Sequence, residues 1–337
     1  MSYPVITPGE ARVLANKTWT LGDREFRFGE RPMLGSEAFV YPLYDSDEQL
    51  VAFVRFSLRV LTPERLQRTQ WLIGQRLDEK TPVFKAAPYS WLSTFQQGRP
   101  DGVSIDFVAT LHAAVRGESW RAIKRRCDNE QKLPLMKKRI AAAKQLISHL
   151  AILESIGRHG FIHGDVSDGN FMIDLATGEA YLIDFDAFIY TTSDTLKFPR
   201  LSFEAGGVKG TIGYMPPELE ESTAGEAFPF SDRYARDMLL IELLGFQLGD
   251  PIDASPKFWE EPGLTQQKLQ KNCRELSLTH LLRPDVFELP EKHRPCSREL
   301  AVKAQCQMPD CKIQLAPFTV KVPESSKPVV LRERKAK

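Results

Sequence analysis

Two short polar clusters, each beside an apolar stretch, constrain this chain more than any other feature. They lie at 161–170 and 181–186. The flanking apolar residues predict short strands that project polar side chains from tight turns. The clusters supply Asp165, Asn170 and Asp184, a base and two metal ligands at the spacing used to transfer a phosphoryl group from a magnesium nucleotide. Gly-Asp and Asp-Gly also occur in plain turns, but that alternative needs three polar residues to coincide with two strands by accident.

Composition and charge set the class of protein. The chain has 337 residues, of which 42% are hydrophobic and 26% are charged, as expected of one large domain or two lobes. A formal net charge of +1 argues against a general nucleic-acid or anionic-membrane surface, so neither partner is expected. The longest apolar run, 238–244, contains Glu242 and is too short to span a bilayer. Residues 1–5 contain neither a basic stretch nor an apolar signal core, which predicts a cytoplasmic protein.

The cysteines indicate thiols rather than disulfides. The chain contains five, an odd number that fits a reducing compartment. Cys296, Cys306 and Cys311 cluster late in the chain with His293 nearby. A zinc site would need closer paired spacing, so we expect free thiols there and assign these three no role.

The first part of the chain predicts strands interrupted by one helix. Alternating apolar and polar residues at 25–28, 39–41 and 51–56 are typical of strands. The helix is predicted to start at Pro63, because Thr62 suits the N-cap and proline the first helical position. Its buried face is expected to contain Leu66, Trp71, Ile73 and Leu77.

The pattern becomes helical after Pro134. Apolar residues recur three and four apart over 140–153, and Gly157 or Gly160 is expected to end that helix. A strongly apolar helix is predicted near 234–244. We therefore expect an α+β fold with a strand-rich N-terminal lobe, a mainly helical C-terminal lobe and a cleft between them. The expected segments are an N-terminal extension at 1–29, the two lobes at 30–111 and 112–305, and a basic flexible tail at 306–337.

Over about residues 30–300 these motifs resemble the protein kinase superfamily, which implies a bilobal kinase-like fold. The segment from His163 to Asn170 resembles the catalytic loop, with Gly164 where most protein kinases carry Arg. The segment 184–186 resembles the metal-binding motif, with Asp186 in the usual Gly position. Both also look like the aminoglycoside and choline phosphotransferases, so the catalytic loop alone does not separate the two classes.

Three downstream segments resemble protein kinases alone. The segment 210–219 resembles the end of an activation segment, and 231–235 resembles the start of the helix whose Asp braces the catalytic-loop backbone. The segment 294–300 resembles a late Arg-Pro motif, in which Arg294 would pair with Glu218. Other details are similar to an atypical bacterial branch of eukaryotic-like Ser/Thr kinases, whose members often occur beside phosphatases or stress-response proteins. A protein substrate or such a regulatory protein is therefore the expected partner.

The resemblance implies roles for individual residues and requires ATP and Mg²⁺. Asp165 would orient the acceptor hydroxyl and accept its proton, while Asn170 and Asp184 would hold magnesium. Thr211 would bond to Asp165 and shape the peptide site. The adenine would lie between apolar residues, and the strand near 107–109 would supply the hinge. These apolar residues are Val40 and Ala52 above, and Met172 or Ile183 below.

Two departures concern the nucleotide phosphates. In the expected phosphate loop, 34–41, Gly35 and the small Ser36 still allow a tight turn, whereas Glu37 adds negative charge. The following strand offers Phe53 or Arg55 in place of the usual Lys, and the helix partner would be Glu64 or Glu79. An Arg55–Glu64 pair is also explained as a plain surface ion pair worth about 0–1 kcal/mol.

Three functions remain open at this point. The first is an atypical protein Ser/Thr kinase dependent on ATP and Mg²⁺, and the second is a nucleotide-binding pseudokinase that acts as an interaction module. The third is a small-molecule phosphotransferase.

Asp168 is interpreted as a turn residue. The segment between Asp184 and Glu218 is a candidate regulatory segment. Arg200 and Lys209 could form ion pairs with a phosphorylated residue in it. Its hydroxyl residues include Thr191, Thr192, Ser193, Thr195 and Ser202.

Overall fold

The structure is a computed structural model, and its chain divides into two compact units between Ala114 and Val115. Each unit is considered by itself. The residues that the structure describes are 14–16, 18–21, 24–34, 38–57, 63–92, 96–98, 104–106, 109–157, 160–190, 198–199, 210–217, 226–227, 231–250, 252, 264–283, 285–289, 293–308, 313 and 315.

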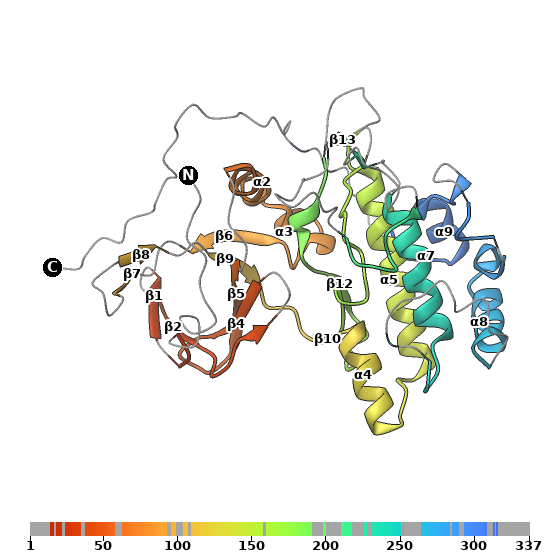
Figure 1. Cartoon of the computed structure of the whole chain (residues 1–337), viewed down its shortest axis with the longest axis horizontal. Helices are drawn as coiled ribbons and strands as arrows, with labels where there is room; N and C mark the ends of the chain where they lie inside the picture. Colours follow the sequence, from red (N-terminus) through yellow and green to blue (C-terminus); the bar gives the residue numbers. More distant parts are fainter. Residues whose placement is uncertain are drawn as a thin grey trace. The chain divides into compact units, whose positions relative to one another are not determined.

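The first unit is built on one antiparallel sheet in the order β1-β2-β4-β5-β9-β6, with β3 paired to β4 (Figure 1). Its strands are β1 (Thr18–Leu21), β2 (Arg24–Phe28), β3 (Met33–Leu34), β4 (Ala38–Tyr44), β5 (Leu50–Ser57), β6 (Pro88–Leu92) and β9 (Ala109–Ala113). A separate hairpin joins β7 (Gln96–Gly98) to β8 (Ser104–Asp106). The helical elements are α2 (Pro63–Gly74), α3 (Leu77–Lys80) and the 3₁₀ turn η1 (Pro82–Phe84).

The two faces of this sheet differ in burial. In β5, Ala52, Val54 and Phe56 are buried in the hydrophobic core, while the residues between them are only half-buried. Tyr41 pairs with Val54 across the strands, and its ring packs edge-on against Phe56 at a centroid distance of 6.4 Å. The alternation therefore gives the sheet one face packed into the core and a second face of mixed character.

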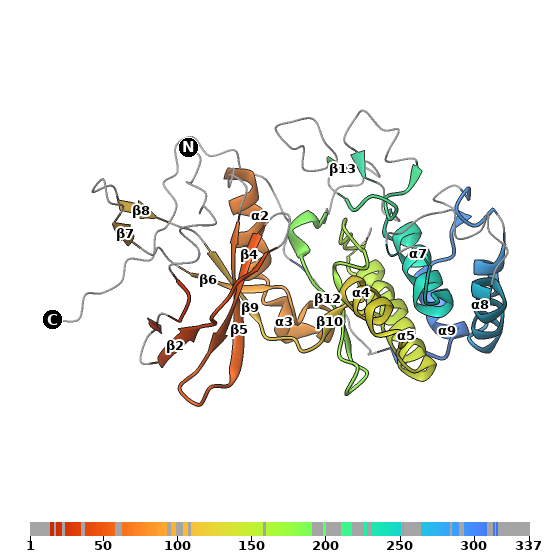
Figure 2. The same cartoon turned by 60° about the horizontal axis from the view of Figure 1, so that its bottom comes forward.

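The second unit is mainly helical (Figures 1 and 2). Its helical elements are α4 (Trp120–Glu130), α5 (Met136–Ser155), η2 (Phe185–Ala187), α7 (Ser231–Gly245), α8 (Leu264–Glu275), η4 (Thr279–Leu282) and α9 (Ser297–Lys303). A small antiparallel sheet has the order β10 (Glu118–Ser119), β11 (Phe171–Ile173) and β12 (Ala180–Leu182). Short strands β13 (Phe198–Pro199) and β14 (Glu226–Ala227) form a further pair. The α+β fold class, with a strand-rich unit followed by a mainly helical one, is confirmed.

Helices α5 and α7 pack against each other at the centre of this unit, and a buried arginine joins them. The guanidinium of Arg139 on α5 donates to the carbonyl oxygens of Leu243, Glu242 and Phe246 at 2.7, 3.1 and 2.9 Å. The last carbonyls of a helix lack partners within the helix, so this side chain satisfies the end of α7. It also lies over the ring of Trp120 at 5.5 Å.

The predicted helices and strands lie close to the observed ones. The helix expected at Pro63 begins there, whereas Thr62 lies outside the described residues. The helix expected to end at Gly157 or Gly160 ends at Ser155. Strands cover the segments 25–28, 39–41 and 51–56, as predicted.

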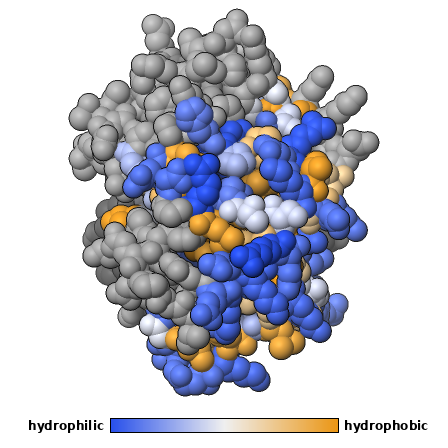
Figure 3. All heavy atoms as spheres, turned by 90° about the vertical axis from the view of Figure 1, so that its right-hand side faces the viewer, coloured by the Kyte–Doolittle hydropathy of each residue, from blue (hydrophilic) through white to orange (hydrophobic). Residues whose placement is uncertain are grey.

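The described cysteines, Cys127, Cys273, Cys296 and Cys306, are free thiols, and Cys311 lies outside the described residues. Across the described ranges, no helix is both long and apolar enough to cross a membrane. On the side of the second unit that carries α8 and α9, the coloured surface is mostly hydrophilic (Figure 3). Exposed charged residues of these two helices include Lys271, Arg274, Arg298, Glu299 and Lys303.

The buried His149 of α5 should make the free energy of unfolding depend on pH. His149 is buried, and this burial lowers its pKa from 6.5 to about 4. Between these values the unfolded chain binds a proton that the folded chain excludes, so the folded state loses stability as the pH falls from 6.5 toward 4. We expect His149→Leu to remove this loss, which approaches about 3 kcal/mol at the acid end.

Urea unfolding across that pH range measures the effect. His293→Leu, at an exposed position, provides the matched control for the substitution itself. An unchanged acid loss in His149→Leu would contradict the assignment.

Candidate functional site

The loop 161–170 is anchored at its start by backbone bonds and aromatic packing. Ile162 and Ile189 exchange two backbone hydrogen bonds of 2.9 and 2.8 Å. Phe161 stacks on Phe188 at a centroid distance of 5.2 Å. Nε2 of the fully buried His163 lies 3.0 Å from the carbonyl oxygen of Ile183. The loop therefore enters the site in a fixed direction.

Gly164 turns the chain where there is no room for a side chain. Its φ is +80°, in the left-handed region that favours glycine. A Cβ at this position would lie 2.5 Å from the carbonyl oxygen of Ala187. This close approach is a physical reason for glycine at the position where most protein kinases carry Arg.

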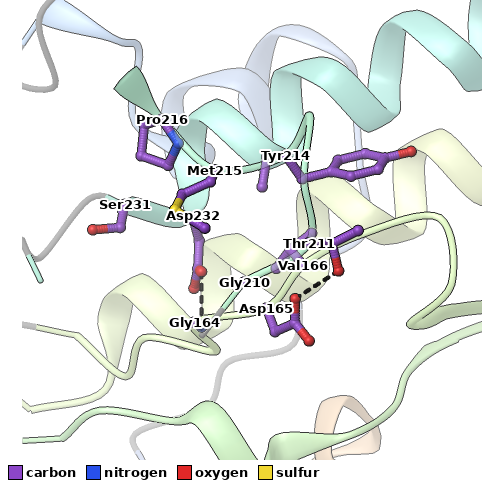
Figure 4. Close-up of a pocket in the computed structure, with 11 residues that line it drawn as sticks. Gly164, Asp165, Val166, Gly210, Thr211, Tyr214, Met215, Pro216, Ser231 and Asp232 are labelled. Carbon is purple, nitrogen blue, oxygen red and sulfur yellow. Dashed lines mark hydrogen bonds between the residues drawn. The ribbon is translucent and has the colours of Figure 1, made fainter. Parts of the chain in front are cut away.

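Both oxygens of the Asp165 carboxylate accept hydrogen bonds, each from a different segment. Nδ2 of Asn170 donates to Oδ2 and to the backbone oxygen of Asp165, both at 2.9 Å. Oγ1 of Thr211 donates to Oδ1 at 2.8 Å (Figure 4). The structure therefore brings Asn170 and Thr211 to the Asp165 carboxylate, and the predicted Thr211–Asp165 bond is present.

Asp184 reaches the same end of the small sheet through strand pairing. Phe171 in β11 pairs with Leu182 in β12, and the N–H of Ile183 donates to the carbonyl oxygen of Asn170 at 2.9 Å. Asp184 follows at φ 61° and ψ 66°. This left-handed conformation costs a residue other than glycine about 1–2 kcal/mol, and such strain occurs at functional sites.

The donor set at this end suits magnesium. Nδ2 of Asn170 is turned to Asp165, which leaves the amide Oδ1 for a metal, and Asp184 directly follows the residue whose N–H bonds to the backbone of Asn170. Mg²⁺ prefers oxygen ligands and is usually held by one or two protein groups together with phosphate oxygens and water. Among the described residues, no group of three or more His, Cys, Asp and Glu could hold a metal, so any ion here would need such additional ligands.

Asp232, at the start of α7, holds the backbone of the loop. Its Oδ2 accepts from the N–H of His163 at 2.6 Å, and its Oδ1 accepts from the N–H of Gly164 at 3.0 Å. The brace implied by the kinase resemblance is therefore present. Burial raises the pKa of Asp232 to about 6, although the two N–H groups favour the charged form.

A pocket opens beside Asp165 and Thr211 (Figure 4). The loop 161–170 forms one wall, and the segment 210–216 and the start of α7 form the others. Its lining residues are Gly164, Asp165, Val166, Gly210, Thr211, Tyr214, Met215, Pro216, Ser231, Asp232 and Ala235. Ile212, next to Thr211, is 87% exposed. An acceptor hydroxyl in this pocket would meet Asp165 among largely apolar walls.

Asp168 differs from its interpretation as a turn residue. The side chain is fully buried and forms ion pairs with two residues of α4. Its Oδ1 accepts from Nε of Arg121 at 3.0 Å, and its Oδ2 lies 2.9 Å from Nζ of Lys124. The interpretation was wrong because turn statistics cannot register cations that are 47 and 44 residues away in the sequence.

In the first unit, Val40 and Arg55 share one face of the sheet, and Ala52 does not. Val40 pairs directly with Arg55, whereas Ala52 pairs with Leu43 and is buried in the core on the opposite face. Val40 and Ala52 therefore cannot cover one side of an adenine together. Phe53, which pairs with Pro42, is an aromatic residue that lies half-buried on the face of Val40.

The other first-unit candidates are only partly described. Gly35, Ser36 and Glu37 lie outside the described residues, as does the side chain of Glu64 on α2. The side chain of Glu79, on α3, pairs with Arg76. The expected ion pair of Arg55 with Glu64 or Glu79 therefore stays a prediction.

The expected hinge, on the strand near 107–109, stays a prediction. Phe107 and Val108 lie outside the described residues, and Ala109 is the first residue of β9. The strand continues to Ala113 inside the sheet, so the connection to the second unit comes only after it. Gly117 lies in that connection at φ +115°, and a Cβ there would be 2.4 Å from the carbonyl oxygen of Ile173.

The remaining predicted residues lie in the second unit. Met172 in β11 is half-buried between two buried neighbours, and Ile183 after β12 is half-buried between the buried Leu182 and the half-buried Asp184. Arg294 is buried and lies over the ring of Tyr234 at 5.1 Å. Glu218 is outside the described residues, as are Arg200, Lys209 and the hydroxyl residues named for the regulatory segment. The Glu218–Arg294 pair thus stays a prediction.

A buried polar cluster behind the pocket, formed by Lys124, Asp168, Glu242 and Tyr214, was not predicted. Lys124 on α4 contacts both Asp168 and Glu242 of α7, and Glu242 accepts a hydrogen bond from Tyr214 at 2.8 Å. The local signal was the spacing of Arg121 and Lys124, three residues apart on one helix face. A charged residue inside the apolar stretch 238–244 was a second signal, because buried carboxylates need partners.

Comparison with known proteins gives two matches. The sequence model of the phosphotransferase enzyme family (APH) matches residues 92–190. U-box domain-containing protein 33 of Arabidopsis thaliana is 30% identical over 106 residues, which cover 32% of this chain and 12% of that protein. The chain thus spans about an eighth of the length of this curated relative.

The family match supports a kinase-like phosphotransferase site at the coarse level. It includes Asp165, Asn170 and Asp184 and ends before Thr211. The acceptor, protein or small molecule, is not determined by either match, and the bacterial protein-kinase branch is not supported by them.

A side chain at Gly164 should destabilise the fold. Gly164→Ala should destabilise the fold by about 3 kcal/mol, because it adds a steric clash to the left-handed backbone penalty. Gly178 is the matched control: its φ is +83°, but the nearest atom to a Cβ there is Cδ of Lys138 at 3.9 Å. Gly178→Ala should cost only the backbone penalty, about 1–2 kcal/mol. Equal losses in the two variants, measured by urea unfolding, would refute the close approach at Gly164.

Proposed function

We propose that this protein is an ATP- and Mg²⁺-dependent kinase that transfers the γ-phosphoryl group to a serine or threonine hydroxyl of a protein. The observation that carries the proposal is the Asp165 carboxylate, held between Asn170 and Thr211 on the wall of a pocket. Asp184 follows directly from the strand that pairs beside Asn170. One carboxylate thus faces a pocket that would take the acceptor, and the amide and the second carboxylate would form a separate oxygen-ligand pair.

The chain's own residues define the chemistry. Asn170 Oδ1 and the Asp184 carboxylate would hold magnesium, which neutralises charge on the transferred phosphoryl group when bound. Asp165 would accept a hydrogen bond from the acceptor hydroxyl, align its oxygen for in-line attack, and receive its proton late in a largely dissociative transfer. The bonds from Asn170 and Thr211 would keep the carboxylate from rotating out of that alignment.

The segment around Thr211 supports a protein acceptor. Thr211 contacts Asp165 directly, and Asp232 holds the loop backbone on the other side of the pocket. The resemblance associates both features with protein kinases and not with small-molecule phosphotransferases. The exposed Ile212 and the apolar pocket wall suit a peptide side chain next to the acceptor residue. The substrate protein, or a regulatory protein such as a phosphatase or stress-response protein, would be the partner.

A small-molecule acceptor is the second candidate, because the family match at 92–190 is to phosphotransferases. That match covers the base and the metal ligands, which both classes share, and not the segment 210–217. A nucleotide-binding pseudokinase is the remaining alternative, since Arg55 lies where a compact Lys ammonium would be expected.

The first functional prediction separates the base from the metal ligand. Asp165→Ala should abolish phosphoryl transfer yet leave Mg²⁺-dependent ATP affinity within about threefold, because Asp165 meets the acceptor rather than the nucleotide. Asp184→Asn should instead weaken Mg²⁺-dependent binding, while asparagine tolerates the left-handed backbone at this position. Calorimetric ATP titration and single-turnover transfer measure the two effects.

Two outcomes would oppose the assignment. Undiminished transfer by Asp165→Ala would remove Asp165 from the chemistry. ATP binding by the wild type without any turnover would establish the pseudokinase alternative.

The second functional prediction concerns the acceptor class. With radiolabelled ATP we expect label in protein, as phosphoserine or phosphothreonine, including this chain itself. Phosphopeptide mapping should find at least one site among residues 191–202. Thr211→Val should reduce protein labelling by about tenfold or more, because it removes the hydroxyl that orients Asp165. Labelling of aminoglycosides or choline with no labelled protein would establish the small-molecule alternative.

A further inference from the structure

Lys124 is a fully buried lysine on α4 whose ammonium contacts three separate parts of the second unit. Nζ lies 2.9 Å from Oδ2 of Asp168 in the catalytic loop and 2.7 Å from Oε2 of Glu242 in α7. It also donates to the carbonyl oxygen of Ile252 at 2.5 Å. The side chains of Lys124, Asp168 and Glu242 are all 0% exposed. The ammonium therefore has no water to replace these partners if one of them moves.

Asp168, the first partner of Lys124, lies in the loop between the proposed base Asp165 and the proposed metal ligand Asn170. Asp168 lies three residues after Asp165 and two before Asn170. Arg121 also holds it, by a side-chain ion pair of 2.8 Å and by a backbone bond of 3.0 Å from its N–H to the carbonyl oxygen of Asp168. The position of Asp168 relative to α4 thus fixes the middle of the loop.

The second contact reaches the opposite wall of the pocket. Oε1 of Glu242 accepts a hydrogen bond from the hydroxyl of Tyr214 at 2.8 Å. The N–H of Tyr214 donates to the carbonyl oxygen of Thr211 at 3.0 Å, so this tyrosine closes the turn that presents Thr211 to Asp165. Lys124 thus contacts both the carboxylate behind the loop and the carboxylate behind the turn, and the Tyr214 hydroxyl also contacts the backbone of Asp168 directly.

Charge balance explains why this lysine is needed. Asp168 and Glu242 are two carboxylates in one buried space, and without a cation between them they would repel each other. Burial raises the pKa of Glu242 to about 7 even though the nearby Lys124 acts in the opposite direction and favours its charged form. Apolar residues would serve stability equally well in such a place, so a buried charged cluster is better explained by the arrangement that it specifies.

We propose that Lys124 is a positioning residue for the acceptor site: through Asp168 and through Glu242 and Tyr214 it sets the distance between the catalytic loop and the turn that carries Thr211. This inference rests on the proposed function for its consequence in catalysis, but its structural content concerns two segments of this chain alone. Loss of the cation should let the two walls separate while leaving the nucleotide ligands Asn170 Oδ1 and Asp184 in place.

The test compares Lys124→Met, which keeps the length of the side chain without its charge, with Lys124→Arg, which keeps the charge. Arg126 is the matched control, because it lies on the same helix but forms exposed ion pairs with Glu118 and Glu130. All variants are assayed well below their own unfolding midpoints. Lys124→Met should lower kcat about thirtyfold while the KM for ATP changes less than about threefold, Lys124→Arg should recover most of kcat, and Arg126→Met should resemble the wild type.

Hydrogen exchange of the full chain gives a readout that needs no activity. In Lys124→Met the amides of 161–170 and 210–217 should exchange about tenfold faster, while those of α9 keep the wild-type rate. Uniform acceleration across the second unit, or equal losses of kcat in Lys124→Met and Lys124→Arg, would mean that Lys124 is only structural and would overturn the proposal. If Lys124→Met does not fold, Glu242→Gln replaces it, with faster exchange expected at 210–217 only.

The two readouts separate the inference from the proposed function. Local acceleration of exchange in a protein that transfers no phosphate would support the positioning role of Lys124 and refute the kinase activity. Normal exchange in both segments of an active Lys124→Met variant would refute the positioning role and leave the kinase activity standing.

Discussion

Two adjacent backbone N–H groups in the loop 161–170 point to one carboxylate, and the geometry of the site depends on that contact. His163 and Gly164 both donate to Asp232, because the left-handed turn at Gly164 directs their N–H groups toward the start of α7. These donors are enclosed and have no strand to pair with, so an unpaired state would be costly. The direction of Asp165, the next residue, follows from this brace.

The brace in turn depends on how α7 is held, and this helix is held by charges as well as by apolar packing. Arg139 satisfies its last carbonyls, and Arg233 pairs with Glu154 of α5 at 3.2 Å. Glu154 also accepts from the N–H of Ser297 at 2.9 Å, which connects the start of α9 to the same group. A helix buried along nearly its whole length would slide easily against apolar neighbours alone. Partnered charges fix its register, and with it the height at which Asp232 meets the loop.

How far the sequence predicts this site depends on the range of each interaction. Asp165, Asn170 and Asp184 could be identified because their spacing is fixed by one turn and one strand pair. The contacts of Asp232 and Thr211 were also predictable, because ordered motifs carry them. The partners of Asp168 were not, since its two cations lie on a separate helix and no local pattern records which buried charges meet.

The error in the first unit has a different cause. In β5 both faces carry apolar residues, so alternation alone did not show that Ala52 and Val40 lie on opposite sides. The segment 107–115, apolar apart from Thr110 and His112, also gives no sign of where its strand ends. Pairing of Phe56 with Ala109 and of Ala52 with Ala113 sets that end, and only the neighbouring strand supplies this information.

The question of acceptor class reduces to what surrounds Asp165 on the side away from the metal ligands. Both phosphotransferase classes need a carboxylate beside a hydroxyl, and the family match covers that shared part. A small acceptor can be oriented by contacts to its own rigid ring, whereas a peptide hydroxyl sits on a flexible chain and gains its alignment from the protein. Thr211, closed into a turn by Tyr214 and bonded to Asp165, is a rigid wall of the kind that a flexible acceptor requires. In the proposed function, the buried charges behind that wall would stabilise a surface that a protein acceptor needs and a self-orienting ligand does not.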